Sequence, residues 1–157
     1  TTPTVLIVDD EEMVRTALEQ WLRLSGFATH VASSAAEALD MLDDVRPDLI
    51  LTDVRMPGLS GLDLLRSVRE RALASEVILI TGHGDVPMAV EAMRGGAFDF
   101  LQKPYVPDQL VKTLRRAAQQ ACLKRESPIS AAEAPVPHNR AIAKIAFRMP
   151  YPPINPA

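Results

Sequence analysis

Five polar residues stand where short apolar runs end, and their types fit the transfer of a phosphoryl group. In chain order they are Asp9, Asp10, Asp53, Thr81 and Lys103. Carboxylates that lie close together need a cation to neutralise them, and hard oxygen ligands in small number suit Mg²⁺. A carboxylate can also act as a nucleophile and form an aspartyl phosphate. In phosphoryl transfer the protein mainly positions groups and neutralises charge, so a metal ion, a lysine and a hydroxyl group suffice.

The five residues divide this chemistry between them. We expect Asp53 to be the nucleophile, because it leads a loop and follows the run that predicts the middle strand. Asp9 and Asp10 would hold the metal ion. Lys103 would pair with the phosphoryl oxygens, and Thr81 would donate a hydrogen bond to one of them. Each residue alone has an ordinary explanation, as a helix cap, a turn residue or a solvated lysine. Their joint occurrence at equivalent strand ends favours the chemical interpretation.

The elements that bring these residues together are predicted from the hydrophobic pattern. Apolar runs predict five strands, at residues 5–8, 27–31, 49–51, 77–80 and 97–101. Helical stripes lie between the runs, and the first stripe, which includes Met13 and Trp21, is expected to face the core. Short loops and right-handed crossovers then favour an α/β fold, a doubly wound five-stranded parallel sheet with helices on both faces. Ligands of such a sheet bind outside the carboxyl ends of its strands.

The composition of the 157-residue chain changes near residue 126. Seven of the 13 prolines lie after that point, whereas all seven glycines lie between Gly26 and Gly96. The net charge is −5 over residues 1–126 and +2 over residues 127–157. We therefore predict one domain at residues 1–126, whose long last helix starts near Pro107, and a Pro/Ala-rich tail that is irregular or extended. One explanation for the tail is that it is artificial or comes from an altered reading frame.

Several classes of protein are disfavoured by the same composition. A mildly acidic domain has no broad positive field that would attract nucleic acid or an anionic membrane. No apolar run approaches the ~20 residues of a membrane span, and the first residues lack the features of a secretion signal. The single cysteine, Cys122, cannot form an internal disulfide and is expected to be a small packing residue. We expect a cytoplasmic protein.

Four segments of the chain carry a resemblance to a known family. They are VLIVDD, LILTDVRMPGLSG, ILITGHG and GAFDFLQKP, at residues 5–10, 49–61, 78–84 and 96–104. With these segments at this spacing, the chain resembles the receiver domain of two-component response regulators over about residues 4–125. The stretch from Thr81 to Pro104 is most similar to receivers of the NtrC class, and within it to those that regulate C4-dicarboxylate transport. The resemblance implies the strand order 2-1-3-4-5.

The resemblance also implies how the acidic residues are used. Asp53 would be the phosphoacceptor. Asp9 and Asp10 would be the acidic pair that holds Mg²⁺, with Asp10 as the more direct ligand. Asp53 itself and the backbone carbonyl of Arg55 would complete the metal site.

Switching and partners follow from the same resemblance. Thr81 would be the switch hydroxyl, Phe100 the switch aromatic residue, and Lys103 the lysine that pairs with the phosphoryl group. The Lys103–Pro104 peptide is expected to be cis. A sensor histidine kinase would phosphorylate the domain. Phosphorylation would then change the surface of the fourth helix, fifth strand and fifth helix, and so modulate a homodimer and a transcriptional output domain. The chain has no G-x-x-x-x-G-K-[ST] motif, so we do not expect it to include the ATPase of NtrC-class regulators.

We expect no enzyme activity beyond the domain's own phosphorylation and dephosphorylation, but three rival functions were weighed. A phosphatase of the haloacid-dehalogenase type would need a carboxylate two residues after its nucleophile, where this chain has Arg55. A flavodoxin-like cofactor carrier would need a phosphate-binding loop after the first strand, where residues 9–12 are all acidic. A receiver-like scaffold that is never phosphorylated is the third alternative, and the intact set of acids disfavours it.

Overall fold

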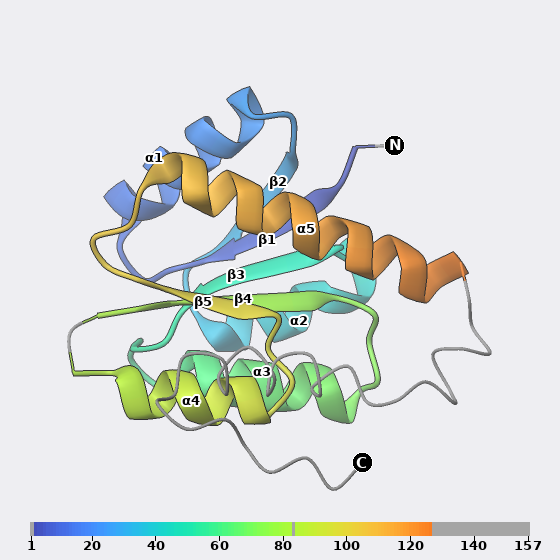
Figure 1. Cartoon of the computed structure of the whole chain (residues 1–157). Coiled ribbons are helices and arrows are strands. Elements are labelled where there is room, and N and C mark those ends of the chain that lie inside the picture. The colour runs from blue at the N-terminus through green and yellow to red at the C-terminus, as the bar shows by residue number, and fades with distance from the viewer. Residues whose placement is uncertain (1, 83, 127–157) are drawn as a thin grey trace, which may run out of the picture.

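The computed structural model describes residues 2–82 and 84–126, which form a sheet covered by helices on both faces (Figure 1). The strands are β1 (Thr4–Val8), β2 (Ala28–Ala32), β3 (Leu49–Asp53), β4 (Glu76–Thr81) and β5 (Asp99–Gln102). They alternate with α1 (Glu12–Leu24), α2 (Ala35–Val45), α3 (Gly61–Glu70), α4 (Val86–Arg94) and α5 (Pro107–Glu126). In this described part of the chain, no helix has both the length and the apolar character needed to cross a bilayer. The predicted tail at residues 127–157 lies outside it.

All neighbouring strands are parallel, in the order β2-β1-β3-β4-β5, which confirms the predicted fold class. The strand order reverses at β1, which pairs with both β2 and β3. The register pairs Val8 of β1 with Thr52 of β3, so that Asp9 and Asp53 follow at neighbouring positions. Open parallel sheets bind their ligands at such a switch point.

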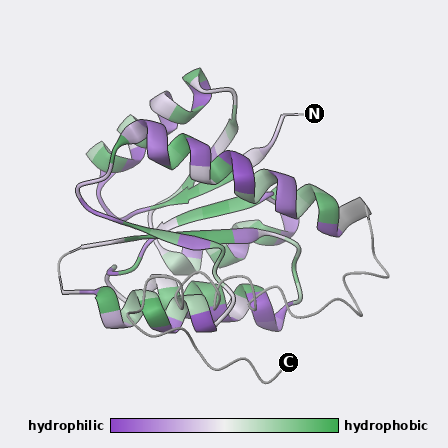
Figure 2. Cartoon of the chain, viewed as in Figure 1, coloured by the Kyte–Doolittle hydropathy of each residue, from purple (hydrophilic) through white to green (hydrophobic). Residues whose placement is uncertain are grey.

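Two apolar cores, one on each face of the sheet, hold the strands in place. Because successive strand residues point to opposite faces, Val5 and Ile7 pack with α1 and α5, whereas Leu6 and Val8 pack with the other three helices. Figure 1 shows α1 and α5 above the sheet and α2, α3 and α4 below it. The hydrophobic colouring of the central strands in Figure 2 matches this burial on both faces. Burial on both faces explains why these strands read as continuous apolar runs.

Helix α1 departs from its predicted packing. Leu18 and Leu22 are buried on the sheet, but Met13 is 86% exposed and Trp21 is 39% exposed. The apolar stripe is wider than the arc of the helix that touches the sheet, so the edges of the stripe remain at the surface. The prediction that the whole stripe faces the core is therefore wrong. The prediction that Cys122 is a small packing residue is also wrong, because Cys122 is exposed on α5.

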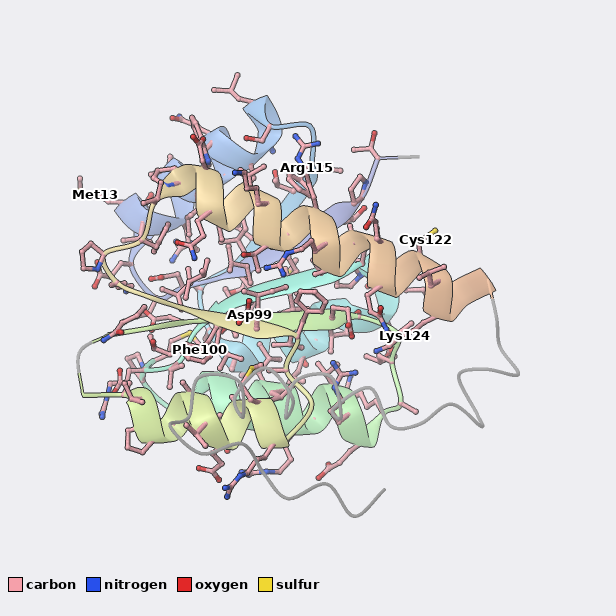
Figure 3. The ribbon with its side chains drawn as sticks, viewed as in Figure 1. Met13, Asp99, Phe100, Arg115, Cys122 and Lys124 are labelled. Atoms are coloured by element: carbon pink, nitrogen blue, oxygen red, sulfur yellow. The ribbon has the colours of Figure 1, made fainter. Side chains whose placement is uncertain are left out.

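A buried charge network lies at the amino-terminal edge of the sheet. The Glu76 carboxylate, at the start of β4, is 4% exposed and accepts a hydrogen bond from Lys124 Nζ at 2.6 Å. Arg69 Nη2 of α3 lies 3.5 Å from the same oxygen and also donates to the carbonyl of Ser75 at 3.3 Å. Since α3 and α5 cover opposite faces, Glu76 ties both helices to one strand. Figure 3 shows Lys124 near the distal end of α5.

We predict that Lys124→Met lowers the free energy of unfolding by about 3 kcal/mol, because it leaves a buried carboxylate without its closest cation. Urea denaturation at neutral pH measures the change. Lys112→Met is the matched control, since Lys112 is an exposed lysine on the same helix and should change stability little. An unfolding midpoint of Lys124→Met that equals that of Lys112→Met would contradict the prediction.

Candidate functional site

The predicted site residues gather at the carboxyl ends of the strands, on the left of Figure 1. Asp9 follows β1, Asp53 ends β3, Thr81 ends β4, and Lys103 follows β5. These strands are far apart in the sequence but adjacent in the sheet. The parallel topology therefore brings together groups that the chain separates by up to ninety-odd residues.

The centre of the site is an ion pair between Asp53 and Lys103. Lys103 Nζ donates to Asp53 Oδ2 at 3.0 Å, and the backbone N–H of Arg55 donates to Asp53 Oδ1 at 3.3 Å. The Asp53 side chain remains 14% exposed, so a small molecule can reach it. The backbone N–H of Lys103 donates to the Thr81 carbonyl at 2.7 Å, which holds the end of β5 against β4. The Lys103–Pro104 peptide is cis, as the family resemblance implied.

Asp9 carries the strongest sign of crowded negative charge. It is 3% exposed, and its Oδ1 accepts a hydrogen bond from the backbone N–H of Glu11 at 2.8 Å. Burial raises the pKa of Asp9 above the usual aspartate value, and the nearby charge of Asp53 raises it further, although Lys103 acts in the opposite direction. Asp10 is exposed and also contributes to raising the pKa of its neighbour.

Lys103 is held in its charged form by these acids. Burial alone would lower the pKa of its ammonium group. The hydrogen bond that Lys103 donates to Asp53 and the charges of Asp53, Asp9 and Glu11 outweigh burial, so the pKa of Lys103 lies above the usual lysine value. The site thus pairs a lysine that stays protonated with more acids than this one cation can neutralise.

Thr81 and Phe100 lie beside the site rather than in contact with its carboxylates. The Thr81 side chain is completely buried, and Oγ1 donates to the carbonyl of Leu101 at 3.4 Å. Phe100 is half-buried and packs against the core below the sheet, on the side of α4 in Figure 3. Thr81 must therefore give up its bond to Leu101 before it can donate to a group on Asp53.

The loop after Asp53 closes so tightly that it needs a glycine. The backbone N–H of Gly61 donates to the carbonyl of Val54 at 2.9 Å, and a Cβ atom on Gly61 would overlap the carbonyl oxygen of Asp53. The next turn of chain is fixed by a capping box, in which Ser60 and Asp63 each accept from the other's backbone N–H. The start of α3 therefore fixes the position of the backbone that carries Asp53.

The donor set at this edge fits a magnesium ion. Within residues 2–82 and 84–126, no three side chains of His, Cys, Asp or Glu lie close enough together to hold a metal by themselves. Mg²⁺ usually binds one or two carboxylates and keeps several water ligands, so a magnesium site does not require three such side chains close together. The carboxylates of Asp10 and Asp53 and the carbonyl of Arg55 are all hard oxygen donors. Burial is the main reason that the pKa of Asp9 is raised, and the charges of Asp53 and Asp10, which a cation would offset, raise it further.

An ion pair at this edge was not predicted from the sequence. Arg55 Nε donates to Asp85 Oδ1 at 2.6 Å, and it links the loop after β3 to the start of α4. Asp85 is the residue just before α4. The sequence gives no sign that its carboxylate points back toward a residue 30 positions earlier.

Comparison with known proteins agrees with this fold. The chain matches the response regulator receiver domain over residues 5–115. It is 47% identical over 116 residues to the transcriptional regulatory protein FixJ of Rhizobium meliloti (strain 1021), a match that covers 74% of this chain and 57% of FixJ. It is 42% identical over 125 residues to the C4-dicarboxylate transport transcriptional regulatory protein DctD of the same organism, covering 80% of this chain and 27% of DctD. The chain belongs to the response regulator receiver domain family.

The crystal structure of FixJ-N gives the same result at the level of the fold. Its TM-score is 0.72 at 45% identity, and the match covers 76% of this chain and 95% of that one. The predicted likeness to C4-dicarboxylate transport regulators is confirmed, and FixJ is similar to a comparable degree. The chain spans about half the length of FixJ and about a quarter of DctD. It has the role of a phosphorylation-activated receiver of two-component signalling, and neither the phosphatase nor the cofactor carrier is supported.

We predict that Asp9→Asn raises the free energy of unfolding at pH 7 in the presence of EDTA. Asparagine keeps an acceptor for the Glu11 N–H but removes the buried charge. Because the folded-state pKa of Asp9 is raised, its ionisation destabilises the folded protein progressively as the pH rises above the usual aspartate value. The gain in the variant should therefore shrink as the pH falls toward 4.

Urea denaturation across pH 4–7 tests this expectation. Asp40→Asn, which changes an exposed aspartate on α2, is the control and should show no comparable gain. A variant Asp9→Asn that is less stable than wild type at pH 7, by an amount independent of pH, would show that the prediction is wrong.

Proposed function

We propose that Asp53 is the phosphoacceptor of this receiver domain. A carboxylate oxygen of Asp53 attacks the phosphorus atom of a phosphohistidine or of a small acyl phosphate. The new P–O bond forms as the bond to the imidazole nitrogen or to the acetate oxygen breaks, and the leaving group departs with that electron pair. The observation that carries this proposal is the pairing of a partly exposed carboxylate with Lys103 Nζ at 3.0 Å, at the switch point of a parallel sheet.

The other groups at the edge position the phosphoryl group and neutralise its charge. Lys103 moves from its bond with Asp53 to a phosphoryl oxygen, for which its raised pKa keeps it protonated. Asp9, Asp10, Asp53 and the carbonyl of Arg55 are the proposed ligands of Mg²⁺. When bound, Mg²⁺ supplies positive charge that offsets these carboxylates and the phosphoryl oxygens. The tight turn at Gly61 keeps the attacking carboxylate in place.

Phosphorylation is proposed to act on the surface formed by α4, β5 and α5. Thr81 exchanges its bond with the Leu101 carbonyl for a phosphoryl oxygen, and Phe100 fills the space that Thr81 leaves. Because β5 carries Phe100 and pairs with Thr81 of β4, the change is transmitted along one strand pair. We propose that this surface modulates a homodimer and an output domain, with transcription as the regulated process.

We predict that incubation with acetyl phosphate and Mg²⁺ adds one phosphoryl group to the wild-type chain and none to Asp53→Ala. Intact-mass spectrometry detects the adduct. Asp44→Ala, a change of an exposed aspartate on α2, should be modified as wild type is. An equal adduct on Asp53→Ala would rule out the assignment, and so would an unmodified wild-type chain in a preparation that folds normally.

An apolar groove beside the site is a suitable docking surface for the proposed sensor histidine kinase. The groove has a volume of about 450 Å³ and lies between α1 and the start of α5, where it is lined by Met13, Val14, Ala17, Leu18, Trp21, Tyr105, Pro107 and Leu110. A kinase must bring its phosphohistidine to Asp53, so it must contact the surface around the strand ends. Burial of Met13, which Figure 3 shows projecting from the start of α1, would then contribute to binding.

We predict that Met13→Glu slows phosphotransfer from a phosphorylated histidine kinase about tenfold, since the loss of a buried methionine contact costs about 1.5 kcal/mol or more. The rate with acetyl phosphate should not change, because that donor needs no protein contact. Leu24→Glu is the matched control, since Leu24 is 83% exposed at the other end of α1. The kinase used is one that phosphorylates the wild-type chain. Equal kinase rates for Met13→Glu and Leu24→Glu would exclude docking at this groove.

A further inference from the structure

The carboxylate of Asp85 connects two loops of the site instead of capping its own helix. Asp85 precedes α4, yet its side chain makes no capping hydrogen bond to that helix. Its Oδ1 accepts from Arg55 Nε at 2.6 Å, and its Oδ2 accepts from the backbone N–H of Gly82 at 3.3 Å. The carboxylate is 4% exposed, so these partners replace the water that would otherwise solvate it.

Arg55 contacts the site on one side and α4 on the other. Its backbone N–H donates to Asp53 Oδ1 at 3.3 Å, while its side chain reaches Asp85 and is 70% exposed. An arginine with this exposure can turn toward a new anion without disturbing the core. Its planar guanidinium is also well matched to phosphoryl oxygens, which it can bind through two hydrogen bonds.

The first turn of α4 has few other anchors. Val86 is 47% exposed and Pro87 is exposed as well, whereas Met88 is partly buried against the core and Ala89 is the first fully buried side chain of the helix. The backbone N–H of Ala89 donates to the Asp85 carbonyl at 3.0 Å. Since α4 begins at the same end of the sheet as the site residues (Figure 1), Asp85 contributes to holding this turn next to the site, together with the core contacts of Met88 and Ala89.

We propose that the Arg55–Asp85 ion pair is a latch that holds the start of α4 in its unphosphorylated position, and that a phosphoryl group on Asp53 releases it. The inference rests on the proposed function of Asp53. A phosphoryl group adds close to two negative charges two residues from Arg55, and the guanidinium then has two anions that compete for it. If Arg55 turns to the phosphoryl group, the buried Asp85 carboxylate loses its cation and must move toward water.

The latch also connects to the switch threonine. Gly82, which donates to Asp85 Oδ2, follows Thr81 directly in the chain. Movement of Asp85 therefore frees the backbone next to Thr81 at the moment when its hydroxyl must exchange partners. Arg55 is thus a positioning residue, because it acts on α4 through Asp85 rather than on the phosphorus atom itself.

Hydrogen exchange of residues 86–94 tests the latch with beryllofluoride and Mg²⁺ as the phosphoryl mimic. In wild type, the amides of the first turn of α4 should exchange faster when beryllofluoride is bound. In Arg55→Gln and Asp85→Asn they should exchange about fivefold faster than in wild type without the mimic, and gain little more on its addition. Arg66→Gln is the matched control, because it breaks an exposed arginine–aspartate pair of 3.3 Å on α3, and should behave as wild type.

Two results would overturn the latch. One is an α4 exchange rate in both variants that equals the wild-type rate without the mimic. The other is an equal further gain in variants and wild type when the mimic is added. Bound beryllofluoride is detected separately, by its ¹⁹F resonance in wild type and its loss in Asp53→Ala. If wild type shows no such resonance, the proposed function of Asp53 fails; if the resonance is present and α4 does not respond to the variants, only the latch fails.

Discussion

The imbalance of charge at the carboxyl edge of the sheet is the constraint on which the rest of the site depends. Asp9 and Asp53 lie next to each other after β1 and β3, and Lys103 is the cation that contacts Asp53 directly. Burial raises the pKa of Asp9 and the charge of Asp53 raises it further, whereas the pKa of Lys103 is raised because its hydrogen bond to Asp53 and the nearby acids outweigh its burial. The folded protein therefore tolerates unfavourable repulsion at this edge, and any cation that binds there relieves it.

The remainder of the fold keeps that edge rigid. Two apolar cores hold the strands from both faces, so the carboxylates cannot move apart to reduce their repulsion. Gly61 allows α3 to approach the carbonyl of Asp53 more closely than any side chain would permit. At the opposite edge, Glu76 joins α3 and α5 through Arg69 and Lys124. Rigid strands that end in loops with charged side chains are well suited to a site that must respond to a change in charge.

That the candidate residues meet at one edge of the sheet could be predicted from the sequence, but their contacts could not. Asp53 and Lys103 could be predicted together because the carboxyl ends of parallel strands always meet at one edge. The bond of Thr81 to the Leu101 carbonyl and the pairing of Arg55 with Asp85 could not, because each depends on side-chain conformations that distant packing selects. The hydrophobic pattern also assigned Trp21 to the core, whereas it is 39% exposed. That pattern reports which residues are apolar, whereas exposure depends on which neighbours are present to cover them.

The same charge imbalance explains why the edge suits both the transfer reaction and the switch. A phosphoryl group on Asp53 would increase the negative charge at a place where acids already exceed their cations, so the nearby cations gain more by turning toward it. Lys103 is one such cation, and Arg55, on the adjacent loop, is another that a short movement would bring there. Lys103 leaves only Asp53 itself, whereas Arg55 would leave the buried Asp85 at the start of α4. The effect on the surface of α4, β5 and α5 therefore depends less on the new contacts of the phosphoryl group than on which carboxylate loses its cation.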